Sequence, residues 1–384
     1  MHFEFATAGR IVFGAGRLAE LGNLAQPFGS RALVVTGSRS EPGEQAAQRL
    51  ADAGIFSSMR SIRGEPSVEE AIQGASWART TVVEMVVAIG GGSVLDAGKA
   101  IAALAANRDD PLDYLEVIGA GRPLPNAPLP FIAIPTTAGT GSEVTRNAVL
   151  ASREHRVKVS LRSPRMLPSV ALLDPELTVS LPPGPTATTG LDAITQLIEA
   201  AVSARANPLT DTLCREGLLR AVEALPRAVR DGGDLAARTD LQFAALCSGF
   251  ALANAGLGAV HGLAGPIGGR FPAPHGAVCA ALLIPILRGN LRALQEREPE
   301  SPALGRFRRV AHWVGGRRSA AASDLVPALE ALTAPLGVPG LSHHGISAAD
   351  FPELIRQSRQ SSSMKGNPVT LRDDELHEAL AAAL

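Results

Sequence analysis

The chain has 384 residues, enough for two domains with separate cores, and its 36 basic and 37 acidic residues leave a formal net charge of −1. This balance favours neither nucleic acid nor an anionic membrane as a partner, and we predict no signal peptide and no apolar run long enough to span a bilayer. Three cysteines, none in a CxxC pair, are too few for a disulfide framework and are predicted to be buried apolar residues of a cytoplasmic protein.

The first half of the chain alternates buried strands with helical segments, which predicts an α/β domain. The expected strands are residues 10–14, 32–35, 82–89, 131–134 and 157–160, and the expected helices are residues 17–25, 44–53, 67–79 and 94–106. Residues 107–130 are rich in proline and glycine and are predicted to form a surface loop. A strand, a tight turn and a helix in succession, as at residues 32–53, begin a dinucleotide-binding fold, although α/β folds that bind no nucleotide begin in the same way.

A run of glycines, Gly90–Gly92, and then Ser93 separate a buried strand from the helix that follows. Glycine lets the backbone approach a ligand closely, and a helix N-terminus offers free N–H groups and positive potential. We therefore predict that Gly91, Gly92 and Ser93 bind a pyrophosphate. The alternative is that the glycines serve only the geometry of a tight turn.

A second segment rich in small polar residues, PTTAGTGSEVT at residues 135–145, follows the strand at residues 131–134. Hydroxyl groups just past the end of a strand suit a cofactor site at the carboxyl edge of a parallel sheet. The predicted contacts to phosphate, ribose or the crevice are Thr136, Thr137, Thr140 and Ser142. Arg146 comes next and is a candidate to reach the substrate.

The proline-rich segment at residues 180–186 ends the strand pattern, and the remaining sequence has helical periodicity. We predict an α/β dinucleotide-binding domain over residues 1–182, an all-helical metal and substrate domain over residues 183–384, and a cleft between them. The expected helices are residues 188–204, 208–230, 236–255, 277–291, 304–315, 323–336, 350–358 and 373–384.

Within the second half, His261 and His275 are fourteen residues apart, with four glycines and three prolines between them. This composition indicates two passes of the chain that converge on one point, and neutral imidazole is the commonest metal ligand. The alternative is that each histidine is a hydrogen-bonded core residue. Asp192 and Gln196, four apart in an expected helix, share one side of it. An acidic residue in a first turn also simply favours the helix dipole.

Several of these segments, in the same order, resemble the iron-containing (group III) alcohol dehydrogenases. They are GGGSVLDAGKAIA from Gly90, PTTAGTGSEVT from Pro135, LLDPELT from Leu172, GLDAITQLIEA from Gly190 and NAGLGAVHGLAGPIGGRFPAPHGA from Asn254. The resemblance covers essentially the whole chain. It implies a Rossmann-like N-terminal domain, a helical C-terminal domain, and NAD(P)-dependent hydride transfer between an alcohol and an aldehyde or ketone whose oxygen a divalent metal polarises.

The resemblance also implies roles for individual cofactor-binding residues. The positions that match family residues near the cofactor are Asp96, Lys158 and Thr178. Where the family typically has an aspartate that binds the adenosine ribose, this chain has Gly37, followed by Ser38 and Arg39. The missing carboxylate and the added guanidinium favour a 2′-phosphate, and hence NADP, unless Arg39 is only a solvated surface charge.

The metal ligands that the resemblance implies are Asp192, Gln196, His261 and His275, with Fe²⁺ or Zn²⁺ as the ion. The family has a histidine where Gln196 stands, and an amide oxygen is a neutral and weaker ligand. It often has another histidine, close to the nicotinamide, where Gly265 stands. The first departure affects how tightly a metal would be held, and the second affects how a proton would be transferred during the reaction.

These departures leave other functions open. The first is a metal-independent oxoacid reductase that resembles maleylacetate reductase, in which His261 or Arg146 stabilises the developing oxyanion and Arg146 and Lys365 suit an acidic substrate. A non-catalytic cofactor-binding relative and a lyase similar to dehydroquinate synthase are further alternatives. Members of the family are often dimers, so we expect a cytoplasmic homodimer that acts on a small molecule.

Overall fold

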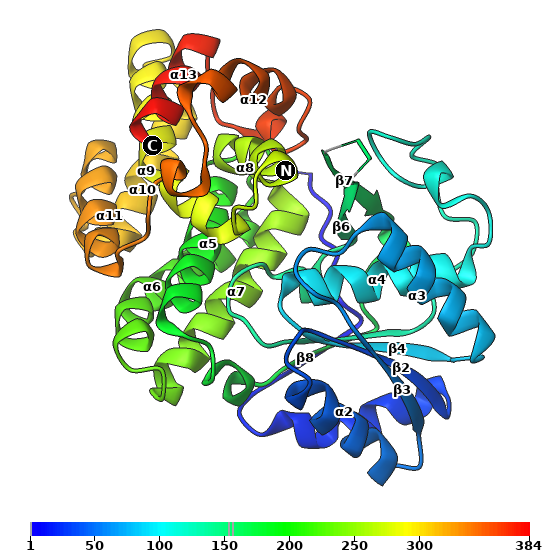
Figure 1. Cartoon of the computed structure of the whole chain (residues 1–384). Coiled ribbons are helices and arrows are strands. Elements are labelled where there is room, and N and C mark those ends of the chain that lie inside the picture. Colours follow the sequence, from blue (N-terminus) through cyan, green and yellow to red (C-terminus); the bar gives the residue numbers. More distant parts are fainter. Residues whose placement is uncertain (1, 153, 156) are drawn as a thin grey trace. The chain divides into compact units, whose positions relative to one another are not determined.

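The computed structural model describes residues 2–152, 154–155 and 157–384, and the chain divides into two compact units, which we call the nucleotide unit and the helical unit (Figure 1). The nucleotide unit is Ala6–Ser180. The helical unit is Leu181–Leu384 together with the N-terminal segment that ends at Phe5. The Phe5 ring packs against Phe250, with 6.1 Å between the ring centroids. The N-terminal segment thus belongs with the helical unit.

Within its described residues, the nucleotide unit contains a six-stranded parallel sheet in the order β1-β8-β5-β4-β2-β3. The strands are β1 (Arg10–Phe13), β2 (Arg31–Thr36), β3 (Phe56–Ser61), β4 (Met85–Gly90), β5 (Phe131–Pro135) and β8 (Val170–Leu173). The chain passes from β2 to β3 on one side and from β4 to β5 on the other, so the direction of winding reverses between β2 and β4. Open α/β sheets bind ligands beyond the carboxyl ends of the strands at such a point.

Helices cover both faces of this sheet, and the pleat sends alternate side chains to two separate cores (Figure 1). The helices are α1 (Leu21–Ala25), α2 (Glu41–Asp52), α3 (Val68–Thr80) and α4 (Gly92–Ala106). Leu33 and Val35 of β2 lie in the core with α3 and α4. Ala32 and Val34 lie in the core with α1 and α2. Burial on both faces explains why these strands appear in the sequence as continuous apolar runs.

Four strands differ from the prediction, and one of them is the short strand β8, which was not predicted. The strand β3 was not predicted because it is an edge strand with mostly polar, solvent-facing residues. The strand β6 (Asn147–Ser152), also not predicted, pairs with β7 (Val157–Arg162) in a two-stranded antiparallel sheet. The strand β4 begins at Met85, later than predicted, because Val82 has a φ of 52°, which a β-strand excludes.

The helical unit consists of helices and loops over Leu181–Leu384, a range that the structure describes without gaps. The helices are α5 (Pro183–Val202), α6 (Pro208–Arg230), α7 (Leu235–Ala255), α8 (Ala259–Arg270), α9 (His275–Arg297), α10 (Pro302–Gly315), α11 (Leu325–Thr333), α12 (Phe351–Ser358) and α13 (Asp373–Ala382). The helix α5 lies at the centre, packed against α6, α7 and α9, and is buried along most of its length.

The helix α8 replaces what the sequence indicated as a turn-rich connection. Its glycines and Pro266 are poor helix formers, so tertiary packing decides its conformation. A Cβ atom on Gly262 would lie 2.9 Å from the Met364 side chain, which shows how closely the backbone of α8 approaches its neighbour. Glycine therefore serves close packing here rather than a turn.

The helix α9 is long and apolar enough to cross a bilayer by length and composition, and so are α7 and α8 together if their mutual bend of 99° is disregarded. The prediction that no apolar segment is long enough to span a membrane is therefore wrong for α9, because the helix extends well beyond the apolar run visible in the sequence. The apolar window of α9 is 72% buried inside the protein, as in the core helix of a folded domain.

Candidate metal and nucleotide sites

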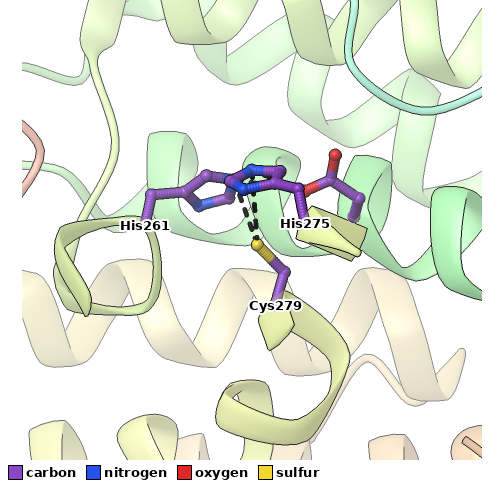
Figure 2. Close-up of side chains that lie close together, drawn as sticks. His261, His275 and Cys279 are labelled. Atoms are coloured by element: carbon purple, nitrogen blue, oxygen red, sulfur yellow. Dashed lines mark hydrogen bonds and ion pairs between the residues drawn. The ribbon is translucent and has the colours of Figure 1, made fainter. Parts of the chain in front are cut away.

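Four side chains from three helices converge inside the helical unit. They are Asp192 on α5, His261 on α8, and His275 and Cys279 on α9, and we call them the tetrad. Their ligand atoms all lie within 4.8 Å of one another. The Nε2 atom of His261 is 3.2 Å from Asp192 Oδ1 and 3.7 Å from Cys279 Sγ. The Nε2 atom of His275 is 3.8 Å and 3.6 Å from the same two atoms. Figure 2 shows both imidazoles turned toward the Cys279 sulfur.

Helix geometry places these four groups. His275 is the first residue of α9 and Cys279 follows one turn later, so both project from the same face. His261 lies in the first turn of α8, and Asp192 lies on the buried side of α5. Since α9 packs against both α5 and α8, their packing is enough to assemble the tetrad.

Glu199 holds the other nitrogen of His261. Its Oε2 atom is 2.7 Å from His261 Nδ1, and its Oε1 atom accepts the backbone N–H of Val260 at 2.7 Å. A carboxylate only accepts, so Nδ1 carries a proton, and a bound cation would replace the proton on Nε2 and take up its lone pair. The sequence analysis missed Glu199. The signal was its spacing of seven from Asp192, which puts two acids on one face of an apolar helix.

The tetrad and Glu199 shift one another's ionisation. Burial by itself would raise the pKa of Asp192, but His275 and His261 outweigh that effect and hold it below its ordinary value. Burial would lower the pKa of His261, but the Cys279 sulfur, Asp192 and Glu199 raise it well above its ordinary value. Burial raises the pKa of the Cys279 thiol to about 12, although His261 opposes the shift. In the absence of a cation, Cys279 is therefore a neutral thiol at pH 7.

Gln196, one turn beyond Asp192, contacts both Asp192 and Ser248. Its Nε2 atom donates to Asp192 Oδ2 at 3.3 Å, and its Oε1 atom accepts the Ser248 hydroxyl at 2.9 Å. Because a carboxylate only accepts, the amide must present its NH₂ group to Asp192. Coordination by the Gln196 oxygen remains a prediction. On α8, a Cβ atom at Gly265 would meet no described atom within 4 Å.

In the nucleotide unit, the predicted cofactor loops meet at the carboxyl ends of three adjacent strands. Thr36 of β2 lies beside Ile89 of β4, and Gly90 of β4 lies beside Pro135 of β5. The turns after β2, β4 and β5 are therefore neighbours at the point where the winding reverses. The predicted residues on these turns are Gly37, Ser38, Arg39, Gly91, Gly92, Ser93, Thr136, Thr137 and Thr140.

The glycines at positions 91 and 92 lie at the start of α4, in close contact with the side chains of Thr137 and Thr140. Gly91 is the residue that precedes α4, and no described side chain caps the helix there. A Cβ atom on Gly91 would lie 3.4 Å from the Thr137 side chain, and one on Gly92 would lie 2.6 Å from Thr140. The close approach requires glycine at position 92, and the free N–H groups of the first turn lie beside threonine side chains.

Asp96 and Lys99 are engaged inside the protein. Asp96 accepts the Ser142 hydroxyl at 2.6 Å and the backbone N–H of Val149 at 2.9 Å. Lys99 is fully buried and donates to the Ser142 carbonyl at 3.0 Å and to the Asn147 carbonyl at 2.6 Å. Lys99 is therefore not a solvated surface charge. Burial lowers its pKa, partly offset by Asp96.

The remaining predicted residues occupy varied environments. Lys158 forms an ion pair with Glu65 at 2.5 Å, and the buried Thr178 hydroxyl donates to the Pro175 carbonyl at 2.8 Å. Arg39 is exposed and lies 3.6 Å from Glu41. Arg146, just before β6, is half-buried. Their contacts with a cofactor or substrate remain predictions.

Comparison with known proteins places the chain in a family. The family model described as "Iron-containing alcohol dehydrogenase" matches residues 8–175, and the model of the "Fe-containing alcohol dehydrogenase family, C-terminal" matches residues 186–384. The chain belongs to the iron-containing alcohol dehydrogenase family. The resemblance inferred from the sequence is thus confirmed, and with it the fold class and the prediction of an alcohol dehydrogenase.

Individual relatives cover all or nearly all of the chain. A 1,3-propanediol dehydrogenase from Klebsiella pneumoniae is 32% identical over 97% of both chains. A solved 1,3-propanediol oxidoreductase superposes with a TM-score of 0.92 at 31% identity and covers 100% of both chains. A sulfoacetaldehyde reductase from Bifidobacterium kashiwanohense, solved with NAD⁺, has a TM-score of 0.85 at 30% identity and covers 100% of this chain and 99% of its own.

The family name implies iron, and the donors of the tetrad suit a divalent transition metal. They are a carboxylate oxygen, two imidazole nitrogens and a thiol sulfur. Nitrogen and sulfur donors favour ions such as Fe²⁺ and Zn²⁺ over Mg²⁺ or Ca²⁺, which prefer oxygen. Three of the four groups are buried, where a shared cation would balance the Asp192 charge. The residues present therefore fit the implied group.

Proposed function

We propose that this alcohol dehydrogenase interconverts a small alcohol and its aldehyde or ketone by hydride transfer with NAD(H), and that Asp192, His261 and His275 hold a divalent metal, Fe²⁺ or Zn²⁺, in the helical unit. The observation that carries the proposal is the tetrad, drawn from three helices that pack together. When bound, such a metal supplies Lewis acidity that stabilises an alkoxide or polarises a carbonyl.

The chain's own residues have distinct tasks in this reaction. Glu199 fixes the tautomer and orientation of His261, so that Nε2 stays available as a donor atom. Asp192 supplies the negative charge that balances a cation. Arg146 is proposed to contact the polar end of the substrate. No ion pair of its guanidinium is found among the described residues.

The nucleotide unit is proposed to bind the cofactor at the carboxyl edge of its sheet. The turn at Gly91–Ser93 would hold the pyrophosphate at the start of α4, and Thr136, Thr137 and Thr140 would donate hydrogen bonds. Ser142 and Asp96 would support this edge through their mutual hydrogen bond. Lys158 and Thr178 are retained as candidate residues near the nucleotide.

We further propose that NADP(H) is accepted, because no carboxylate stands at Gly37 and Arg39 lies exposed nearby. A Cβ atom on Gly37 would have its nearest neighbour, a Val94 methyl carbon, at 3.7 Å, so a side chain fits there. We expect Gly37→Asp to weaken NADPH binding by at least about tenfold relative to NADH, because the carboxylate repels the 2′-phosphate. Fluorescence titration of both cofactors measures this ratio. An unchanged ratio would contradict the assignment of Gly37.

The metal-dependent reaction is tested by His261→Ala. We expect kcat/KM to fall by more than about a hundredfold, because even the loss of a group that supports a metal ligand costs 10–100-fold. The dissociation constant of NADH should stay unchanged, since the proposed nucleotide residues lie in the other unit. His343→Ala, at an exposed histidine of the helical unit, is the matched control. Unaltered turnover of His261→Ala would refute the site.

Elemental analysis separates this function from the metal-independent alternative. Protein loaded with Fe²⁺ or Zn²⁺ and then desalted should retain about one metal per chain. Metal-free protein that still reduces an oxoacid would instead favour a reductase of the maleylacetate type, with His261 and Arg146 as its catalytic groups. We also expect a cytoplasmic homodimer, which size-exclusion chromatography with light scattering tests for the oligomeric state.

A further inference from the structure

We propose that Cys279 is the fourth ligand of the metal centre and that Gln196 stands outside the coordination sphere. The chain would then hold its ion with one carboxylate, two imidazoles and one thiolate. This inference rests on the metal centre proposed above and names a ligand that the resemblance to the family does not supply. It begins from the tetrad, in which Cys279 is as close to both histidines as a ligand must be.

Three of the distances within the tetrad are close to those of a four-coordinate site, and a fourth, from Asp192 to His275, is about half an ångström longer. Around a tetrahedral Zn²⁺, with bonds of about 2.0 Å to nitrogen or oxygen and about 2.3 Å to sulfur, neighbouring N and O ligands lie about 3.3 Å apart and neighbouring N and S ligands about 3.6 Å apart. The Cys279 sulfur is 3.7 Å from His261 Nε2 and 3.6 Å from His275 Nε2. The Asp192 oxygen is 3.2 Å and 3.8 Å from the same two nitrogens.

The position of Cys279 distinguishes it from the other two cysteines. All three are free and buried, so burial alone indicates nothing about metal binding. Cys214 on α6 and Cys247 on α7 are not members of any candidate metal group among the described residues. Cys279 is four residues after His275 on α9, and Figure 2 shows its sulfur directed between the two imidazoles.

The hydrogen bonds of Gln196 assign it a different task. Its NH₂ group faces Asp192 Oδ2, and its oxygen accepts from Ser248. If the amide were turned so that its oxygen faced the site, the hydrogen bond to Asp192, worth about 1 kcal/mol, would be lost and two acceptor oxygens would face each other. In its observed position Gln196 holds one Asp192 oxygen and leaves Oδ1, the atom nearest His261, free to bind a cation. Gln196 is thus a positioning residue for Asp192.

A thiolate ligand changes which ion the centre selects. Sulfur is a soft donor and favours Zn²⁺ over Fe²⁺ in the usual order of divalent affinities. As the metal–sulfur bond forms, the Cys279 proton leaves for the solvent and the sulfur carries the negative charge. We therefore expect this member of an iron-named family to retain Zn²⁺ when both ions are supplied in equal amounts without oxygen.

The optical spectrum of the cobalt-substituted protein tests the ligand directly. The probe is Co²⁺ added to metal-free full-length protein, because thiolate coordination to Co²⁺ gives a charge-transfer band in the near ultraviolet that nitrogen and oxygen ligands do not give. In the unmodified protein we expect the intensity of this band to correspond to one thiolate ligand per Co²⁺. Cys279→Ser should lose the band and bind Co²⁺ at least about tenfold more weakly.

Three matched variants complete the experiment. Cys247→Ser removes another buried thiol and should keep the band. Gln196→Ala should also keep it, with a weaker Co²⁺ affinity, whereas loss of the thiolate band in Gln196→Ala alone would overturn the inference. Cys279→Ala repeats the test if Cys279→Ser proves unstable, and circular dichroism monitors folding of each.

The outcomes separate this inference from the function on which it rests. Stoichiometric Co²⁺ binding by the parent protein without a thiolate band overturns the assignment of Cys279 and leaves the metal-dependent dehydrogenase intact. No Co²⁺ binding at all overturns the metal centre itself. A band that survives Cys279→Ser would place the thiolate elsewhere and likewise overturn the inference.

Discussion

Glu143 shows how a single residue links pH to the stability of the nucleotide unit. It lies in the short turn Ser142–Val144 and is 2% exposed. Burial raises its pKa to about 7, and the Lys99 ammonium offsets only part of that shift. Since an exposed glutamate has a pKa near 4.5, the folded chain keeps a proton that the unfolded chain releases between these two values. The free energy of unfolding should therefore fall as the pH rises from about 4.5 to about 7.

Glu143→Gln tests this linkage, because glutamine keeps the shape and cannot ionise. We expect parent and variant to differ little at pH 4.5, where Glu143 is neutral in the folded state. Above pH 7 the variant should be more stable by up to about 3 kcal/mol. Urea unfolding of both proteins at several pH values gives the difference. A difference that does not change with pH would show that Glu143 does not titrate in this window.

Among individual residues, the sequence identified side chains of the types that commonly bind metals. It did not identify residues whose role depends on which distant side chains they contact in the fold. Asp192, His261 and His275 stood out because of residue type and spacing, and the structure brings them together. Cys279 was interpreted as an apolar residue because nothing in the sequence shows that it faces two imidazoles. Lys99 has partners 43 to 48 residues away, which local patterns do not reveal.

At the scale of elements, glycines decide how closely helices pack. In α5, a Cβ atom on Gly190 would lie 2.5 Å from a Leu225 methyl carbon of α6, and Leu225 is fully buried. In α10, a Cβ atom on Gly305 would have its nearest neighbour at 3.8 Å. The first glycine permits a helix contact, whereas the second only adds flexibility to its helix.

Alanine at these two positions should therefore have opposite effects. We expect Gly190→Ala to lower the free energy of unfolding by about 1–3 kcal/mol through overpacking. Gly305→Ala should raise it by about 0.5–1 kcal/mol, because alanine restricts the unfolded chain and favours the helix. Denaturant unfolding of the two variants beside the parent protein measures both. Stabilisation by Gly190→Ala would mean that Leu225 moves aside without cost.

Elements with a strong periodic pattern were predicted well, and the exceptions have physical causes. The helix α6 has the predicted bounds because its apolar face repeats through its whole length. The helix α8 was not predicted because its glycines and proline are poor helix formers and its neighbours stabilise it. The strand β3 was not predicted because an edge strand need not be apolar. Tertiary contacts override local preference in α8.

For the whole molecule, the fold class could be predicted from the order of strands and helices along the chain. Alternating strands and helices followed by helices alone predict an α/β part and a helical part, and the family confirms that fold. The predicted domain limits at residues 182 and 183 fall close to the observed change of unit after Ser180. The sequence did not predict that the N-terminal segment packs with the helical unit, because its partner Phe250 lies far along the chain.

The packing of Phe5 against Phe250 makes the helical unit discontinuous in sequence. Because the segment that ends at Phe5 belongs with Leu181–Leu384, the nucleotide unit is an insertion within the helical unit, joined to it by two crossings of the chain. During synthesis the segment leaves the ribosome before the nucleotide unit, while its partner helix α7 emerges long afterwards. The nucleotide unit can thus complete its fold on the ribosome, whereas the helical unit can complete its fold only after both of its segments have been made.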